Sequence, residues 1–174
     1  MSYNLLKGKR GIIFGALNDA SIAWKVAERV VEEGAQIVLT NTAVACRMGT
    51  IDELAKKTGA TVIPADATSV EDLNNLFVKA QEALGGKIDF VLHSCAMSVN
   101  MRKKRTYDDL DYGFLDKTLD ISAISFHKML QVAKKLDALN DEASVLALTY
   151  VASHRTFFGY NDMADAKSLL ESIA

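Results

Sequence analysis

The stretch Gly11-Ile-Ile-Phe-Gly-Ala-Leu-Asn-Asp-Ala-Ser-Ile-Ala23 decides the fold, because it passes from an apolar run through a loop into helical periodicity. Residues 11–14 are few, apolar and bounded by glycine, which is typical of a buried strand. From Ile22 onward, apolar residues recur at helical spacing until Gly34, a residue type common at helix ends. The stretch therefore predicts a strand, a loop and a helix, the first part of a β-α-β unit.

The same alternation continues along the chain. Further apolar runs predict strands at 36–40, 61–63, 88–93 and 144–149. Helical periodicity predicts helices at 48–57 and 70–84, and either one long helix or two contiguous ones over about 111–139. Strands with near-continuous apolar character suit a parallel sheet that is covered on both faces. With right-handed crossovers, this pattern predicts an α/β fold over residues 1–174: a single Rossmann-type domain whose doubly wound parallel sheet has the order 3-2-1-4-5.

Composition narrows the class of protein. The 174 residues are 49% hydrophobic and 24% charged, and the formal net charge is −2. This balance argues against a nucleic-acid-binding protein, which would present a strongly basic face. No apolar run approaches the roughly 20 residues that cross a bilayer, and the start has no hydrophobic signal core. Because Cys46 and Cys95 lack metal-like spacing, we expect no metal site and a reduced, cytoplasmic setting.

The loop after the first strand is a candidate phosphate site, since ligands of doubly wound sheets bind beyond the carboxyl ends of the strands. Gly15 would let the backbone approach a pyrophosphate, and the helix beginning near Ile22 would offer unpaired N–H groups. Ser21 is placed to cap that helix and to bind a phosphate. The G-x-G-x-x-G pattern is absent, so an ordinary strand-to-helix turn is an equally good interpretation.

Two later loops complete the candidate cofactor site. Asp66 could accept a hydrogen bond from the exocyclic amine of adenine, with Ala67 leaving room for the ring. Alternatively, Asp66 caps the next turn. After the fourth strand, the small residues Ser94, Cys95 and Ala96 would let a dinucleotide lie across the sheet edge. We interpret the Cys95 thiol as buried and inert, because no partner base is evident.

Tyr160-Asn-Asp-Met-Ala-Asp-Ala-Lys167 follows the fifth strand and is the most informative segment. On a helix, positions seven apart return to one face, about 10.5 Å along the axis. Tyr160 and Lys167 would then share a cleft, with Tyr160 nearer the substrate and Lys167 reaching the cofactor ribose. A lysine ammonium nearby would favour the anionic form of the tyrosine and so lower its pKa.

Taken together, these motifs resemble the enoyl-(acyl carrier protein) reductases, a divergent branch of the short-chain dehydrogenase/reductases. The motifs are Gly15 with Ser21-Ile22-Ala23, Asp66, His93-Ser94, Asp120-Ile121-Ser122, Thr149-Tyr150 and Tyr160-x6-Lys167. The resemblance runs from about Leu6 to Ala174, and residues 7–16 are similar to the form found in Bacteroidetes-type bacteria. Cys95-Ala96 stands where the family usually has Ile-Gly, and His154 where glutamine or glutamate is common.

The resemblance implies a reaction. A nicotinamide cofactor would give hydride to the β-carbon of a trans-2-enoyl thioester on acyl carrier protein. Tyr160 would hydrogen-bond the thioester oxygen, Lys167 would bind the cofactor ribose, and Tyr150 matches a second tyrosine of the pocket. On family grounds the cofactor is NADH; NADPH stays open because residues 39–42 include no acidic side chain. The basic run 102–105 is either a solvated loop or a contact for the acidic carrier protein.

Two other functions are alternatives to an enoyl reductase. A ketoreductase of the same superfamily would carry Tyr-x3-Lys, which requires tyrosine where this chain has Met163. A non-catalytic nucleotide-binding or oligomerisation fragment is the third interpretation. The family continues beyond the equivalent of Ala174 with further strands, so we expect the domain to be incomplete at its C-terminus, with an exposed edge on the fifth strand. The 174-residue chain alone would be poorly stable and nearly inactive, and a homotetramer is expected only of the complete protein.

Overall fold

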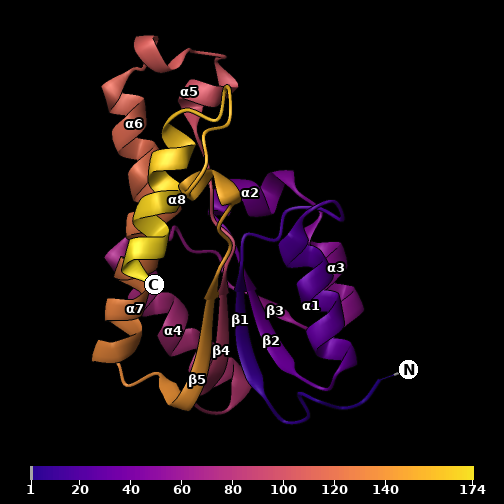
Figure 1. Ribbon diagram of the computed structural model, residues 1–174. Helices are drawn as coiled ribbons and strands as arrows, with labels where there is room; N and C mark the ends of the chain where they lie inside the picture. The colour runs from indigo at the N-terminus through magenta and orange to yellow at the C-terminus, as the bar shows by residue number, and fades with distance from the viewer. Residues whose placement is uncertain (1) are drawn as a thin grey trace.

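One parallel sheet of five strands forms the centre of the computed structural model, which describes residues 2–174 (Figure 1). The strand order is β3-β2-β1-β4-β5, as the sequence predicts. The strands are β1 (Arg10–Phe14), β2 (Gln36–Thr40), β3 (Thr61–Val62), β4 (Ile88–His93) and β5 (Leu139–Ala147). The order changes direction between β1 and β4, so the loops that follow these two strands meet at one point of the sheet edge.

Helices cover the two faces of the sheet and enclose two separate cores (Figure 1). On one face lie α1 (Ile22–Glu32), α2 (Ala43–Met48) and α3 (Ile51–Thr58). On the other lie α4 (Val70–Leu84), α6 (Tyr112–Leu119), α7 (Ser125–Lys135) and α8 (Asp162–Ile173). Shorter segments are α5 (Val99–Arg102), a π-helical turn at Asp120–Ile124 and 3-10 turns at Tyr107–Asp109 and Val151–Ser153. Trp24 and Leu39 belong to the first core, and Phe77 and Phe126 to the second.

The helix predicted at 48–57 is wrong in its extent. The structure divides this region into α2 and α3, with Gly49 and Thr50 between them. The Thr50 N–H donates to the carbonyl of Leu17 (3.0 Å), and a side chain on Gly49 would crowd the same carbonyl. This tertiary contact with the first loop interrupts the helical periodicity of the sequence.

Of the two alternatives for about 111–139, one long helix or two contiguous ones, the second is confirmed, but the helical region ends earlier than predicted. A π-helical turn at Asp120–Ile124 separates α6 from α7, and α7 ends at Lys135. Asp137 then takes a left-handed backbone conformation (φ 49°), and β5 already begins at Leu139. The fifth strand therefore starts five residues earlier than predicted and ends at Ala147 instead of residue 149. As expected, β5 lies at the edge of the sheet, with Leu146 59% exposed.

Two further features considered in the sequence are a membrane-spanning helix and a metal site. Within residues 2–174, no helix has both the length and the apolar character needed to cross a bilayer. The same residues contain no cluster of three or more histidine, cysteine or acidic side chains that could hold a metal ion.

Candidate functional site

The loops after β1 and β4 touch each other at Gly15. Its backbone is left-handed (φ 87°), and its N–H donates to the carbonyl of Thr40 (3.0 Å). A Cβ at this position would overlap the carbonyl oxygen of Ser94. Gly15 is therefore required twice, by its backbone conformation and by the close approach of the β4 loop. This contact brings the two predicted cofactor-binding loops together.

The N-terminus of α1 presents backbone N–H groups, as the sequence suggests, but Ser21 does not cap the helix. Ser21 occupies the N-cap position, but its hydroxyl donates to the carbonyl of Asn18 (2.6 Å) and accepts from the N–H of Leu17 (3.3 Å). The predicted side-chain cap is thus wrong, because Ser21 closes the preceding loop instead. In the described part of the chain, the N–H groups of Ile22 and Ala23 have no acceptor. They remain available to an anion.

Asp66 lies half-buried between β3 and α4 and organises the turn there. One of its carboxylate oxygens accepts from both the N–H (2.8 Å) and the hydroxyl (2.7 Å) of Thr68. The capping alternative is therefore realised, and the adenine contact stays a prediction. Ala67 is buried.

His93, at the end of β4, is a packed strand residue, as expected. Its ring lies between those of Phe14 and Phe126 and is 1% exposed. Nε2 lies 2.8 Å from the hydroxyl of Ser125, which itself donates to the carbonyl of Ile121, so the imidazole is the donor to Ser125. Burial lowers the pKa of His93 to about 4, so the ring is neutral at physiological pH.

In the loop that follows β4, the thiol of Cys95 has the properties of a non-reactive group. Burial raises the pKa of Cys95 to about 12, which keeps its sulfur protonated, as expected of an inert cysteine. Ala96, which follows it, is exposed at the rim, and Ser94 is half-buried. The small side chains leave this edge of the sheet open.

Lys167 lies on α8 and points to the carboxyl end of β5. Its side chain is nearly buried (5% exposed), and Nζ donates to the carbonyl of Leu148 at 2.5 Å. Burial lowers the pKa of Lys167, and its charge is felt at both His93 and Cys95. The ammonium group therefore lies at the same end of the sheet as the β4 loop.

Tyr160 is not part of the helix that carries Lys167. Helix α8 begins at Asp162, and Tyr160 lies in the preceding turn, so the two residues are not related by helical periodicity. The ring of Tyr160 packs on that of Tyr150, with centroids 4.8 Å apart, and Tyr150 packs in turn on Phe157 at 5.4 Å. This arrangement brings the two predicted tyrosines together.

The expectation of a lowered tyrosine pKa is wrong. Burial, with a smaller contribution from Tyr150, raises the pKa of Tyr160. The physical reason is that the Lys167 ammonium donates to the Leu148 carbonyl, and no hydrogen bond joins it to Tyr160 in the described residues. At neutral pH the phenol is therefore protonated and can donate a hydrogen bond.

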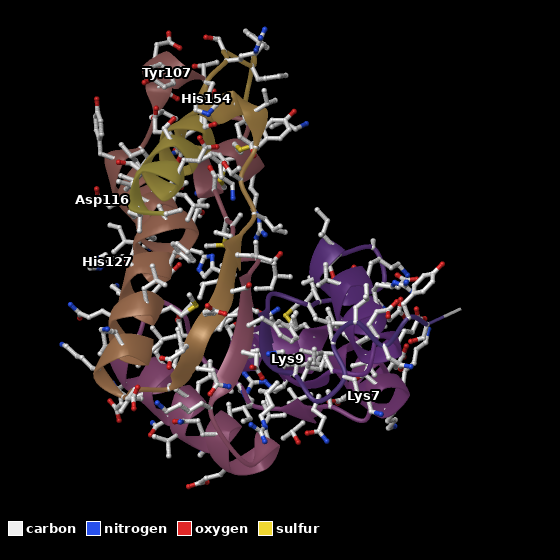
Figure 2. The ribbon with its side chains drawn as sticks, turned by 60° about the horizontal axis from the view of Figure 1, so that its bottom comes forward. Lys7, Lys9, Tyr107, Asp116, His127 and His154 are labelled. Atoms are coloured by element: carbon white, nitrogen blue, oxygen red, sulfur yellow. The ribbon has the colours of Figure 1, made fainter. Side chains whose placement is uncertain are left out.

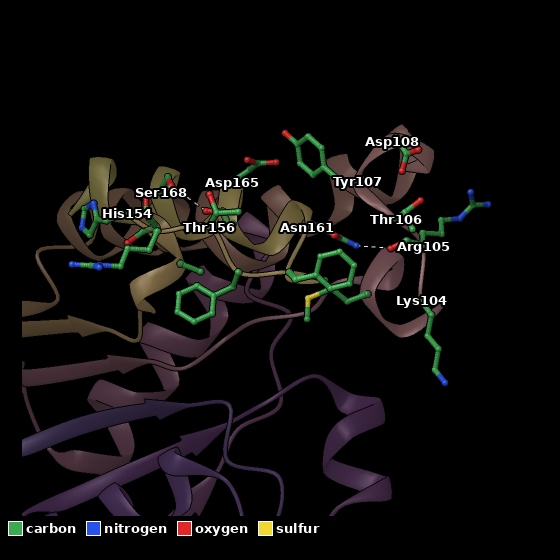
Figure 3. A pocket seen from close by; sticks show the side chains of 18 residues that line it. Lys104, Arg105, Thr106, Tyr107, Asp108, His154, Thr156, Asn161, Asp165 and Ser168 are labelled. Carbon is green, nitrogen blue, oxygen red and sulfur yellow. Dashed lines mark hydrogen bonds between the residues drawn. The ribbon is translucent and has the colours of Figure 1, made fainter.

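A hollow of about 880 Å³ lies elsewhere (Figure 3). It is bounded by the segments 104–108 and 152–159 and by the outer side of α8. The side chains of Tyr107 and His154, which line it, lie at the end of the molecule away from Lys7 and Lys9 (Figure 2). None of the predicted catalytic or cofactor-binding residues lines this hollow, so we place the candidate site at the sheet edge on geometric grounds.

Sequence reasoning missed a buried polar cluster beside Tyr160. The carboxylate of Asp162 is fully buried and accepts hydrogen bonds from Ser98, Asn100 and Thr118. A signal was available, because Asp162 is an acidic residue that lies four positions before the buried Ala166 and so shares its helix face. An acidic side chain on a buried face requires partners.

Comparison with known proteins identifies the family. Residues 15–174 match the family model described as enoyl-(acyl carrier protein) reductase. The chain belongs to this family. The FabI crystal structure from Alistipes finegoldii is 71% identical to this chain, with a TM-score of 0.97 over 99% of this chain and 66% of that one. A FabI–NADH complex from the same organism is 72% identical, with a TM-score of 0.97 over 99% of this chain and 61% of that one.

A curated relative gives the same result at greater distance. The NADH-type enoyl-(acyl carrier protein) reductase FabI of Rickettsia bellii is 34% identical over 173 residues. The match covers 99% of this chain and 64% of that protein. This chain thus spans somewhat less than two thirds of the length of its relative.

Proposed function

We propose that the whole protein is an NADH-dependent enoyl-(acyl carrier protein) reductase, which reduces the trans-2 double bond of enoyl thioesters during fatty acid elongation. The observation that carries this proposal is the grouping of functional side chains after β5. Tyr160 packs on Tyr150, and the buried Lys167 binds the Leu148 carbonyl at the carboxyl end of the strand. Membership of the reductase family gives this grouping its chemical meaning.

The residues at the sheet edge fit a dinucleotide. The free N–H groups at the start of α1 suit a pyrophosphate, and Gly15 keeps the backbone close beneath it. The hydroxyl of Thr40, at the end of β2, is buried and has no hydrogen-bond partner among the described residues. When bound, the nicotinamide would supply the hydride. Lys167 would hold the ribose hydroxyls, because its ammonium group has two donors left beyond the one used by Leu148.

Tyr160 would act on the thioester oxygen of the substrate. As the β-carbon is reduced, negative charge moves to that oxygen, and a fixed phenol donor stabilises it. The raised pKa of Tyr160, caused first by burial, keeps the donor proton in place. Tyr150 would hold the Tyr160 ring in position and exclude water from one side of it.

We propose NADH over NADPH because the relatives named above are NADH-type or bind NADH. The residue after β2 is Asn41, whose side chain is already engaged with the Ala16 carbonyl and the Thr42 N–H. It offers neither a carboxylate for a ribose hydroxyl nor a cation for a phosphate. The next cation along the chain is Arg47, which is exposed on α2. Comparing kcat/KM for the two cofactors tests this choice.

We further propose that the protein works in the cytoplasm as a homotetramer and takes its substrate from acyl carrier protein. Two members of the basic run are engaged within the chain: Lys103 lies over the Phe114 ring at 4.6 Å, and Arg105 pairs with Asp109 at 3.0 Å. A contact with the acidic carrier protein would therefore use Arg102 and Lys104. Reversing both charges should raise the KM for the carrier-protein substrate at low salt, and an unchanged KM would exclude this contact.

The decisive experiment measures NADH oxidation by the whole protein with crotonyl-(acyl carrier protein). We expect steady turnover that requires both the thioester and the protein. Binding of NADH without any turnover would favour the non-catalytic nucleotide-binding alternative.

A further inference from the structure

The carboxylate of Asp162 is an unusual group to find in this position. It is the first residue of α8, and its side chain is fully buried. No ion pair involves it in the described part of the chain. Burying a carboxylate without a cation is costly unless hydrogen bonds replace the lost water. An apolar residue would fill the same space at lower cost, so the carboxylate needs an explanation.

Three buried neutral donors satisfy the carboxylate, and they come from segments far away in the sequence. The Ser98 hydroxyl donates to one oxygen at 2.7 Å. The Asn100 amide (2.9 Å) and the Thr118 hydroxyl (2.8 Å) donate to the other. Ser98 also caps α5, and Thr118 belongs to α6. Asp162 therefore joins the segment that follows β4 to both α6 and α8.

The donors are themselves held in place. The amide of Asn100 makes two hydrogen bonds with the backbone of Asp111. Its oxygen accepts from the Asp111 N–H (3.1 Å), and its nitrogen donates to the Asp111 carbonyl (3.2 Å). The amide cannot turn over without losing both contacts. Because the Asn100 nitrogen faces Asp162, only an acceptor is tolerated at that point of the Asp162 side chain.

This network fixes the turn that carries Tyr160. Only Asn161 separates Tyr160 from Asp162. The backbone of Asn161 is left-handed (φ 46°), which is uncommon for a non-glycine residue. Its side-chain amide donates to the carbonyl of Arg105 at 2.5 Å, a contact drawn in Figure 3. The Tyr160 carbonyl accepts from the N–H of Met163 in the first turn of α8. The position of Tyr160 thus depends on where α8 begins, and Asp162 anchors that point.

We propose that Asp162 is a positioning residue, which holds Tyr160 against Tyr150 in the orientation that the reaction requires. This inference rests on the proposed function, since it concerns the donor to the substrate oxygen. A carboxylate can hold Tyr160 in this way because its three hydrogen bonds are directional. They fix the rotation of α8 about its axis as well as its distance from the core, whereas an apolar side chain would fix only the distance.

The test replaces Asp162 by asparagine in the whole protein, which preserves size but turns one acceptor into a donor. This donor must face either the Asn100 amide or the Ser98 hydroxyl, so one side of the network loses its present hydrogen bonding. We expect kcat per NADH-binding site to fall by about ten- to a hundredfold, the scale of a misplaced catalytic group, with the Kd for NADH within about twofold. The matched control is Asp165→Asn, which alters an exposed carboxylate in the first turn of the same helix and should leave kcat unchanged.

A double-mutant cycle separates positioning from general stabilisation. In a Tyr160→Phe background, Asp162→Asn should cause no further loss, because the group that it positions is already gone. An equal loss in both backgrounds would overturn the proposal, and so would a wild-type kcat in the single variant. If Asp162→Asn fails to fold, the isosteric Thr118→Val variant decides: it should lower kcat by a smaller factor, and unaltered kcat would overturn the proposal.

The activity of the unaltered protein distinguishes a failure of the proposed function from a failure of the positioning role. If it does not reduce crotonyl thioesters, the proposed function fails and this inference falls with it. If it does and the asparagine variant matches it, the positioning role alone is wrong.

Discussion

The ring of Tyr160 lies against the ring of Tyr150, with centroids 4.8 Å apart and planes inclined at 47°. The two tyrosines come from different elements, since Tyr150 follows β5 and Tyr160 precedes α8. Their contact removes water from one side of the Tyr160 phenol, and burial is the main cause of its raised pKa. The proposed proton donor is therefore held in its neutral form by packing and not by the lysine that shares its motif.

Replacing Tyr160 by phenylalanine should abolish most turnover without unfolding the protein. The hydroxyl makes no hydrogen bond among the described residues, so its loss leaves no buried partner unsatisfied. Removing one donor to a developing oxyanion lowers kcat by about a hundred- to a thousandfold. Steady-state kinetics with a crotonyl thioester and NADH measures this. Tyr112→Phe, at a position 76% exposed, is the control and should behave as wild type.

Lys167→Met should lose activity while gaining thermal stability near neutral pH. Burial lowers the pKa of Lys167 in the folded state, so the unfolded chain binds the proton more tightly, and the stability of the wild type rises as pH increases towards the unfolded lysine pKa of about 10.4. Methionine removes this penalty. The difference in Tm between variant and wild type should be largest at neutral pH and should shrink at about pH 10. A difference that stayed constant or grew with pH would contradict this account.

Gly15→Ala should be far more damaging than Gly59→Ala. Both glycines have left-handed backbones, which costs a non-glycine residue about 1–2 kcal/mol. At Gly59 an added Cβ meets no atom within 4 Å, whereas at Gly15 it overlaps the Ser94 carbonyl. The extra overlap should add about 1–3 kcal/mol and separate the two cofactor loops. Denaturant unfolding and NADH titration test this, and equal effects of the two substitutions would refute it.

Glu171→Gln should alter the response of the protein to acid. The Glu171 carboxylate accepts from Thr149 (2.5 Å) and Ser153 (2.7 Å), on either side of Tyr150, and pairs with His154 (2.7 Å). The Thr149 and Ser153 hydroxyls hold the pKa of Glu171 below its usual value, so its contribution to stability is complete above about pH 4.3 and is lost as pH falls through the lowered pKa.

The glutamine variant lacks this titration. Its Tm should be lower than that of the wild type at neutral pH, and the two should converge in acid. Glu82→Gln, an exposed position on α4, serves as the control. Parallel Tm–pH curves for wild type and Glu171→Gln would show that the carboxylate has no such role.

The strand order could be predicted because most strands are short apolar runs bounded by turns, as at residues 11–14 and 36–40. The early part of β5 could not, because its residues 140–142 are polar or charged. The interruption between α2 and α3 could not, since it depends on the contact of Thr50 with Leu17, which is far away in the sequence. The π-helical turn at Asp120–Ile124 was hidden for a similar reason. Its Ser122 hydroxyl accepts from the N–H of Met97 in the β4 loop.

For the candidate site, the sequence proposes residues whose roles stay predictions, and it misjudges part of their geometry. The motif Tyr160-x6-Lys167 identified both residues, but helical spacing placed them on one helix, whereas the left-handed Asn161 separates Tyr160 from α8. Ser21 was expected to cap α1 and instead closes its own loop through Asn18. In both cases local hydrogen bonds decided the conformation, and periodicity alone does not contain them.

We expect the Tyr160 and Lys167 spacing to serve reduction of a carbon–carbon double bond and not of a ketone. Offering the whole protein NADH with crotonyl thioester, and separately with acetoacetyl thioester, tests this most directly. We predict rapid NADH oxidation with the crotonyl substrate and a rate indistinguishable from the blank with the acetoacetyl substrate. Oxidation that depended on the acetoacetyl substrate alone would contradict the assignment.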